Sequence, residues 1–93
     1  MDLGLLHTMC KEDTRNAFND FKRSIECGLF EFNNDVKDDL QNQLKQDTCN
    51  RTVKYFVNNY KLSKTQITYL SQIKEHYTQI ALTALNNYCK RFL

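Results

Sequence analysis

Apolar residues recur every three or four positions along three long stretches of the chain, which is the spacing that places them on one face of an α-helix. The first stretch carries Ala17, Phe18, Phe21 and Ile25. It predicts a helix that begins between Leu5 and Thr14. This helix should end at Cys27-Gly28, because glycine readily adopts the left-handed conformation of a helix cap.

The second stretch runs from Val36 to Tyr60, after an apolar connector made of Leu29, Phe30 and Phe32. Asn33 or Asn34 is the predicted cap of its first helix. The step from Leu44 to Cys49 is one residue too long for a straight stripe, so we expect a bend or a break near Asp47-Thr48. The predicted core residues beyond the break are Val53, Phe56 and Val57.

The third stretch begins with Ser63-Lys64-Thr65-Gln66, which matches a capping box. Its apolar stripe reaches almost to the end of the chain and comprises Ile67, Leu70, Ile73, Tyr77, Ile80, Ala81, Ala84, Leu85 and Tyr88. The absence of proline and the presence of only two glycines favour long uninterrupted helices. Residues 1–93 are therefore predicted to form a single all-α domain, with three to four long helices in a disulfide-linked bundle.

The four cysteines have one geometrically reasonable pairing. Cys10 and Cys27 on one helix would stand roughly 25 Å apart, beyond the reach of a disulfide. Folding each helix back on its predecessor brings Cys10 opposite Cys49 and brings Cys89 close to the connector that begins at Cys27. The sequence thus predicts the disulfides Cys10–Cys49 and Cys27–Cys89.

An even number of widely spaced cysteines in a short chain favours an oxidising compartment, so we expect a secreted, extracellular protein. The first residues lack the basic and apolar regions of a signal peptide, and we therefore take Met1 to be an expression start on a mature chain. No apolar run approaches the roughly 20 residues of a spanning helix, so we expect no membrane segment.

Charge is distributed unevenly, although the net charge is only +2. Ten of the eleven acids lie at or before Asp47, and Glu75 is the only one after it. This asymmetry indicates either internal pairing of the two halves or an acidic partner for the second half. A predicted helix face carries Arg51, Lys54 and Lys61 with Tyr55 beside them, and cations next to an aromatic ring are typical of interfaces.

We interpret this basic face as a candidate protein interface, with the cluster Asp35, Asp38 and Asp39 as second choice. Charge reversal at the three cations should leave the melting temperature unchanged, because they lie opposite the predicted core stripe. Binding of nucleic acid is not expected.

The sequence shows no catalytic or metal-binding arrangement. No two cysteines are closer than 17 positions, whereas zinc ligands come in tight clusters. His7 and His76 stand far apart, and pairing of all cysteines would remove any nucleophilic thiol. We therefore expect no enzymatic activity, no metal and no cofactor. Asn50-Arg51-Thr52 matches an acceptor for N-glycosylation, so Asn50 is a possible modification site.

A helical chain of 11.1 kDa with Cys10, Cys27, Cys49 and Cys89, rich in Asn and Lys, resembles the small salivary anti-complement proteins of sand flies. It is less similar to the larger anti-complement proteins of mosquito saliva. The resemblance implies a secreted salivary protein of a blood-feeding insect that evades host immunity. Such a protein would act as a monomer and inhibit complement, at the classical pathway, by non-covalent binding to a complement protease or convertase component. A helical cytokine-like ligand and a small carrier protein are the alternatives.

Overall fold

A computed structural model describes residues 2–28, 31 and 33–91, and these residues form α-helices joined by short connectors. The helices are α1 (Leu3–Glu26), α2 (Asn34–Asp47), α3 (Asn50–Asn59) and α4 (Lys64–Cys89). No strand occurs among the described residues. The predicted all-α fold is confirmed at this level.

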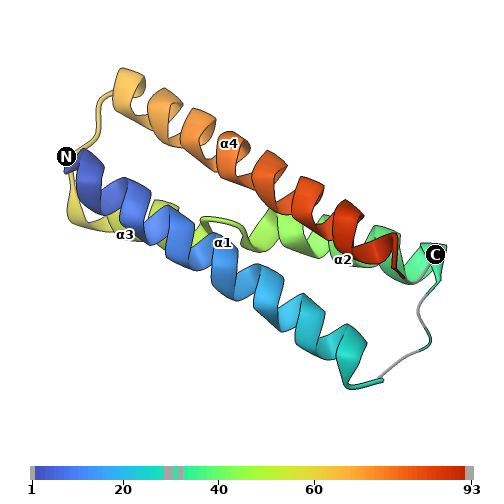
Figure 1. Cartoon of the computed structure of the whole chain (residues 1–93). Helices are drawn as coiled ribbons and strands as arrows, with labels where there is room; N and C mark the ends of the chain where they lie inside the picture. The colour runs from blue at the N-terminus through green and yellow to red at the C-terminus, as the bar shows by residue number, and fades with distance from the viewer. Residues whose placement is uncertain (1, 29–30, 32, 92–93) are drawn as a thin grey trace.

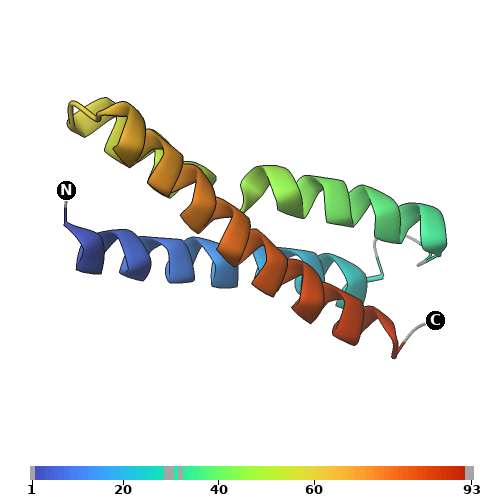
Figure 2. The same ribbon diagram turned by 90° about the horizontal axis from the view of Figure 1, so that it is seen from above.

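The helices form an elongated up-and-down bundle measuring 45 × 19 × 18 Å (Figure 1). Helices α2 and α3 follow one another end to end and run back along α1, and α4 then runs in the direction of α1. Seen from above, α4 crosses the other helices obliquely, starting over α3 (Figure 2). The α2–α3 pair thus acts as one broken rod, so the core is surrounded by three helical rods, namely α1, the α2–α3 rod and α4.

Local capping signals account for most helix ends. Helix α1 begins at Leu3, earlier than predicted, because the side chain of Asp2 accepts a hydrogen bond of 3.1 Å from the backbone N–H of Leu5. Its predicted end is confirmed: Cys27 is the C-cap, and Gly28 has a φ of +65°. The predicted connector residues Leu29, Phe30 and Phe32 lie outside the described residues.

The predicted break in the second stretch is also confirmed. Asn33 caps α2 by accepting from the N–H of Val36 at 3.0 Å. The helix ends at Asp47, and Cys49 then takes the left-handed conformation with a φ of 59° before α3 begins. Lys74 of α4 donates to the backbone carbonyls of Gln46 and Thr48, which places a cation at the C-terminus of α2.

Helix α4 has the predicted start and length. Ser63 and Gln66 form both hydrogen bonds of the capping box. The predicted apolar stripes are less accurate, because Ile67, Ile80 and Val57 are 50%, 48% and 53% exposed. Each of these residues lies at the edge of its apolar stripe, and the neighbouring helices cover only part of that stripe.

The break between α2 and α3 divides the core into two clusters along the bundle. One cluster joins the C-terminal halves of α1 and α4 to α2 and contains Phe21, Ile25, Leu40, Leu44, Ala81, Leu85, Tyr88 and Cys89. The other joins the N-terminal halves to α3 and contains Leu6, Cys10, Cys49, Phe56, Leu70, Ile73 and Tyr77. Within the described ranges, no helix is both long and apolar enough to cross a membrane.

Candidate functional site

Cys10 and Cys49 meet in the core where α1 passes the α2–α3 break. Their exposed fractions are 1% and 0%. The sulfur of Cys49 lies 3.9 Å from the backbone oxygen of Cys10 and 4.0 Å from Oγ1 of Thr14. Cys10 and Cys49, which the sequence predicts to be disulfide-bonded, thus lie in one core cluster, but both are free thiols and the predicted disulfide is not formed in the structure.

The two thiols have unequal acidities. A hydrogen bond from Cys49 lowers the pKa of Cys10, and the same bond together with burial raises the pKa of Cys49. Each thiol therefore affects the ionisation of the other, and burial makes Cys49 the harder of the two to deprotonate. A thiolate beside a thiol is the starting arrangement for an intramolecular disulfide, although burial limits its access to large oxidants.

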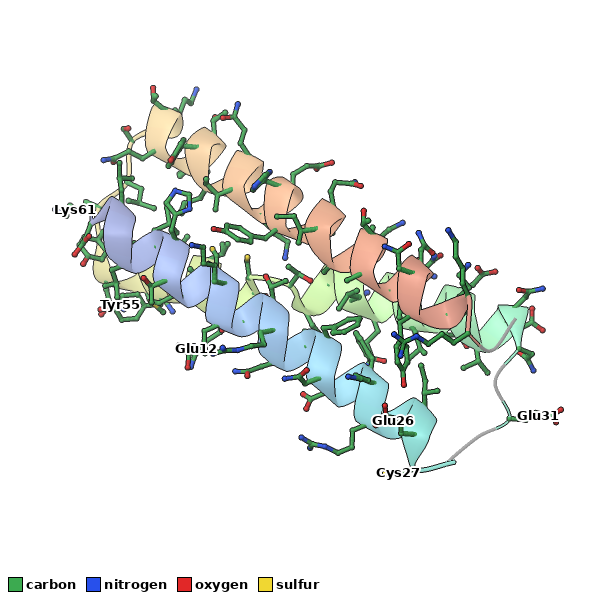
Figure 3. The ribbon with its side chains drawn as sticks, in the orientation of Figure 1. Glu12, Glu26, Cys27, Glu31, Tyr55 and Lys61 are labelled. Carbon is green, nitrogen blue, oxygen red and sulfur yellow. The ribbon has the colours of Figure 1, made fainter. Side chains whose placement is uncertain are left out.

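Cys27 and Cys89 occupy opposite environments near the other end of the bundle. Cys27 is exposed at the C-cap of α1 (Figure 3), whereas Cys89 packs into the core cluster of α2 and is 1% exposed. Burial raises the pKa of the Cys89 thiol. Both are free thiols here. The residues that precede them in sequence nevertheless form a hydrogen bond: the hydroxyl of Tyr88 donates to Glu26 at 2.9 Å.

Arg51 has a structural role that the sequence did not reveal. Its Nε donates to Asp13 at 2.9 Å, and Glu12 lies 4.0 Å away. The second carboxylate oxygen of Asp13 accepts from the N–H and the hydroxyl of Thr52 at 3.0 and 2.6 Å. Since Cys49 provides no side-chain cap, buried Asp13 of α1 supplies the cap that α3 lacks.

The predicted basic face is therefore only partly available. Arg51 is held by two acids of α1, so its reversal to glutamate would place like charges together and lower stability, contrary to our expectation from sequence. Helix α3 ends at Asn59, so Lys61 lies in the connector rather than on the helix face. What remains is Lys54, Tyr55 and Lys61, which we call the α3 surface.

The α3 surface lies at the end of the bundle where α1 begins, as the labels of Tyr55 and Lys61 show (Figure 3). Tyr55 is 38% exposed and packs edge-on against the rings of Phe56 and Tyr60. Both lysines are exposed, and neither forms an ion pair with a described acid. An exposed aromatic ring held by neighbouring rings, together with exposed unpaired cations on the same segment, suits contact with an acidic protein surface.

The remaining candidate residues are the second-choice acids and the two histidines. The second-choice acids Asp35, Asp38 and Asp39 are exposed in the first half of α2. Nδ1 of His7 lies 3.1 Å from the hydroxyl of Tyr77, and His76 is exposed. No group of three or more potential metal ligands gathers among the described residues.

Asn50 is the first residue of α3 and is exposed, so a glycan attached there would point away from the core. The hydroxyl of Thr52, which completes the acceptor motif, donates to Asp13 in the folded chain. Modification would therefore have to take place before this contact forms.

No protein-family model, curated protein or solved structure matches the chain.

Proposed function

We propose that this chain is a secreted, non-enzymatic binding protein of insect saliva that inhibits host complement. The observation that carries the proposal is the α3 surface, where Lys54, Tyr55 and Lys61 are exposed and the two lysines form no ion pair with an acid among the described residues. Such a surface favours association with an acidic patch on another protein.

The resemblance to salivary anti-complement proteins of sand flies supports complement as the target and the classical pathway as the branch. The partner would be a complement protease or convertase component, bound non-covalently by a monomer of this chain. Binding of this kind needs no cofactor. The two predicted disulfides belong to the same proposal, since a secreted domain of this size gains stability from them.

The two alternative functions receive less support from the fold. Cytokine-like bundles have four long helices joined by long crossover connections, whereas here α2 and α3 share one rod and the connectors are short. A carrier needs a cavity that encloses most of its ligand. The grooves found among the described residues lie open on the surface between helices.

Complement-mediated haemolysis tests the function directly. We expect the oxidised protein to inhibit lysis by the classical pathway at micromolar concentration, with inhibition that depends on stoichiometry and not on incubation time. Unchanged lysis at that concentration would exclude complement as the target. Displacement of a lipophilic dye is the parallel assay for the carrier alternative.

The α3 surface is tested by the double variant Lys54→Glu/Lys61→Glu, which spares Arg51 and its contact with Asp13. Its matched control is Lys45→Glu/Lys90→Glu, since either double variant changes the net charge from +2 to −2, two units for each reversal. We expect slower association with the target and a shallower salt dependence for the first variant only. Equal on-rates at low salt would place the interface elsewhere, with Asp35, Asp38 and Asp39 next to be tested.

A further inference from the structure

Three grooves between the helix layers differ sharply in character. The groove between α1 and the α2–α3 rod has a volume of about 540 Å³ and is bordered by Asp13, Asp20 and Asp47. The groove between α2 and α4, of about 500 Å³, is lined mainly by polar residue types and carries charges of both signs. The groove between α1 and α4, of about 330 Å³, is apolar, and both of its charged lining residues are cations.

The floor of the α1/α4 groove is formed by side chains from both helices. Phe18 comes from α1, and Ile80, Ala81 and Ala84 come from α4. Ile80 is 48% exposed, so a large apolar side chain stands in water beside the groove. Two alanines leave room on the α4 side, and an incoming apolar side chain would bury Ile80 and the edge of Phe18.

The α1 rim of the groove is cationic over several turns. Lys11 and Arg15 line it directly, and Lys22 follows on the same side of the helix. These cations span eleven positions, or about 16 Å of helix. None of the three forms an ion pair with an acid among the described residues. The nearby acid Glu12 lies 4.0 Å from Arg51 of α3.

The combination of cations and apolar rings continues past the groove, around Tyr88. Lys22 lies 5.8 Å from the centre of the Tyr88 ring, and Arg91 lies 5.7 Å from it. The Phe18 ring meets Tyr88 edge-on, with 6.1 Å between the ring centres. The apolar floor and the cationic rim therefore continue together toward the C-terminal end of α4.

We propose that the α1/α4 groove docks an acidic amphipathic helix of a partner protein. Apolar side chains of that helix would pack on Phe18, Ile80 and Ala84, and its carboxylates would face Lys11, Arg15 and Lys22. The length of the cationic rim selects this occupant, because a helix of about three turns can present several carboxylates, whereas a fatty acid offers only one. The open shape of the groove also suits a helix, which needs to bury only one face.

This proposal is independent of the complement proposal, since it uses a different surface. The groove is lined by residues of α1 and α4, whereas Lys54 and Tyr55 belong to α3 and Lys61 to the connector that follows it. Loss of binding in the groove and loss of binding at the α3 surface can therefore be separated by variants of each.

The test uses a fluorescein-labelled amphipathic peptide of about four turns, with leucines on one face flanked by glutamates. Its control carries lysines in place of the glutamates. We expect the glutamate peptide to bind more tightly, with affinity that falls as salt rises. Lys11→Glu/Arg15→Glu should weaken binding about tenfold or more, and Ile80→Ser about fivefold.

Control variants locate the binding. We expect wild-type peptide binding from Lys45→Glu/Lys90→Glu and from Lys54→Glu/Lys61→Glu. All variants should keep the melting temperature of the wild-type protein, because the altered side chains are exposed. Equal binding of both peptides, or wild-type affinity in the groove variants, would overturn the proposal. A lipid occupant would also overturn it. In that case dodecanoate or phosphatidylserine vesicles would shift the amide resonances of Phe18, Ile80 and Ala84, and the peptide would not.

Discussion

Tyr77 shows how burial changes the chemistry of a single residue. Its ring is 6% exposed in the core between α1 and α4, and burial raises the pKa of its hydroxyl. A raised pKa means that folding favours the protonated form. The resulting stability is fully present below the ordinary tyrosine pKa of about 10 and is lost as the pH rises through the higher value of the folded state.

We therefore expect the melting temperature to fall above about pH 10 and this fall to be smaller in Tyr77→Phe. Circular dichroism melts at a series of pH values measure it. Part of the dependence should remain in the variant, because burial and the contact with Glu26 also raise the pKa of Tyr88. Identical pH profiles for wild type and variant would show that Tyr77 ionises freely.

At the scale of the element, α3 depends on α1 for its start. The carboxylate of Asp13 accepts hydrogen bonds from the backbone N–H of Thr52, from the hydroxyl of Thr52 and from Nε of Arg51. Asp13→Ala should lower the free energy of unfolding by about 2–4 kcal/mol, because it removes several charge-assisted bonds from a buried site.

Urea unfolding measures this loss, and amide hydrogen exchange should show that α3 opens more often than α1 or α4. The control is Asp20→Ala on the same helix, where the side chain is 71% exposed and, among the described residues, pairs only with Arg23. Its effect should be below about 1 kcal/mol. Equal losses in the two variants would contradict the capping role of Asp13.

Local sequence predicts some helix ends but not the start of α3. Asn33, Ser63 and Gly28 act on backbone groups within a few residues, so their roles follow from local sequence. The cap of α3 comes instead from a residue 39 positions away. No local pattern distinguishes Asp13 from the other acids of α1.

For the whole molecule, the decisive question is whether the cysteines join. We expect peptide mapping of the unreduced, secreted protein to find Cys10–Cys49 and Cys27–Cys89. The first pair already meets in the core, whereas the second requires exposed Cys27 to approach the end of α4. A bond between Cys10 and Cys27 would contradict the fold, because one continuous helix separates them by about 25 Å.

Reduction should lower the melting temperature strongly, since each disulfide closes a long loop and contributes roughly 2–4 kcal/mol. Replacing all four cysteines by serine should prevent stable folding. The pair variants Cys10→Ser/Cys49→Ser and Cys27→Ser/Cys89→Ser divide this loss between the two bonds. A reduced protein that melts within a few degrees of the oxidised one would identify the cysteines as ordinary core thiols.

The sequence alone determined the helices, the end of α1, the caps of α2 and α4 and the break near Asp47, because helical periodicity and local capping act over a few residues. Only the tertiary structure decided which exposed charges are free. Arg51 and Lys54 look alike in sequence, yet one pairs with Asp13 of α1 and the other faces solvent. The apolar α1/α4 groove likewise combines residues more than sixty positions apart. Such contacts depend on how the helices pack, which no local pattern records.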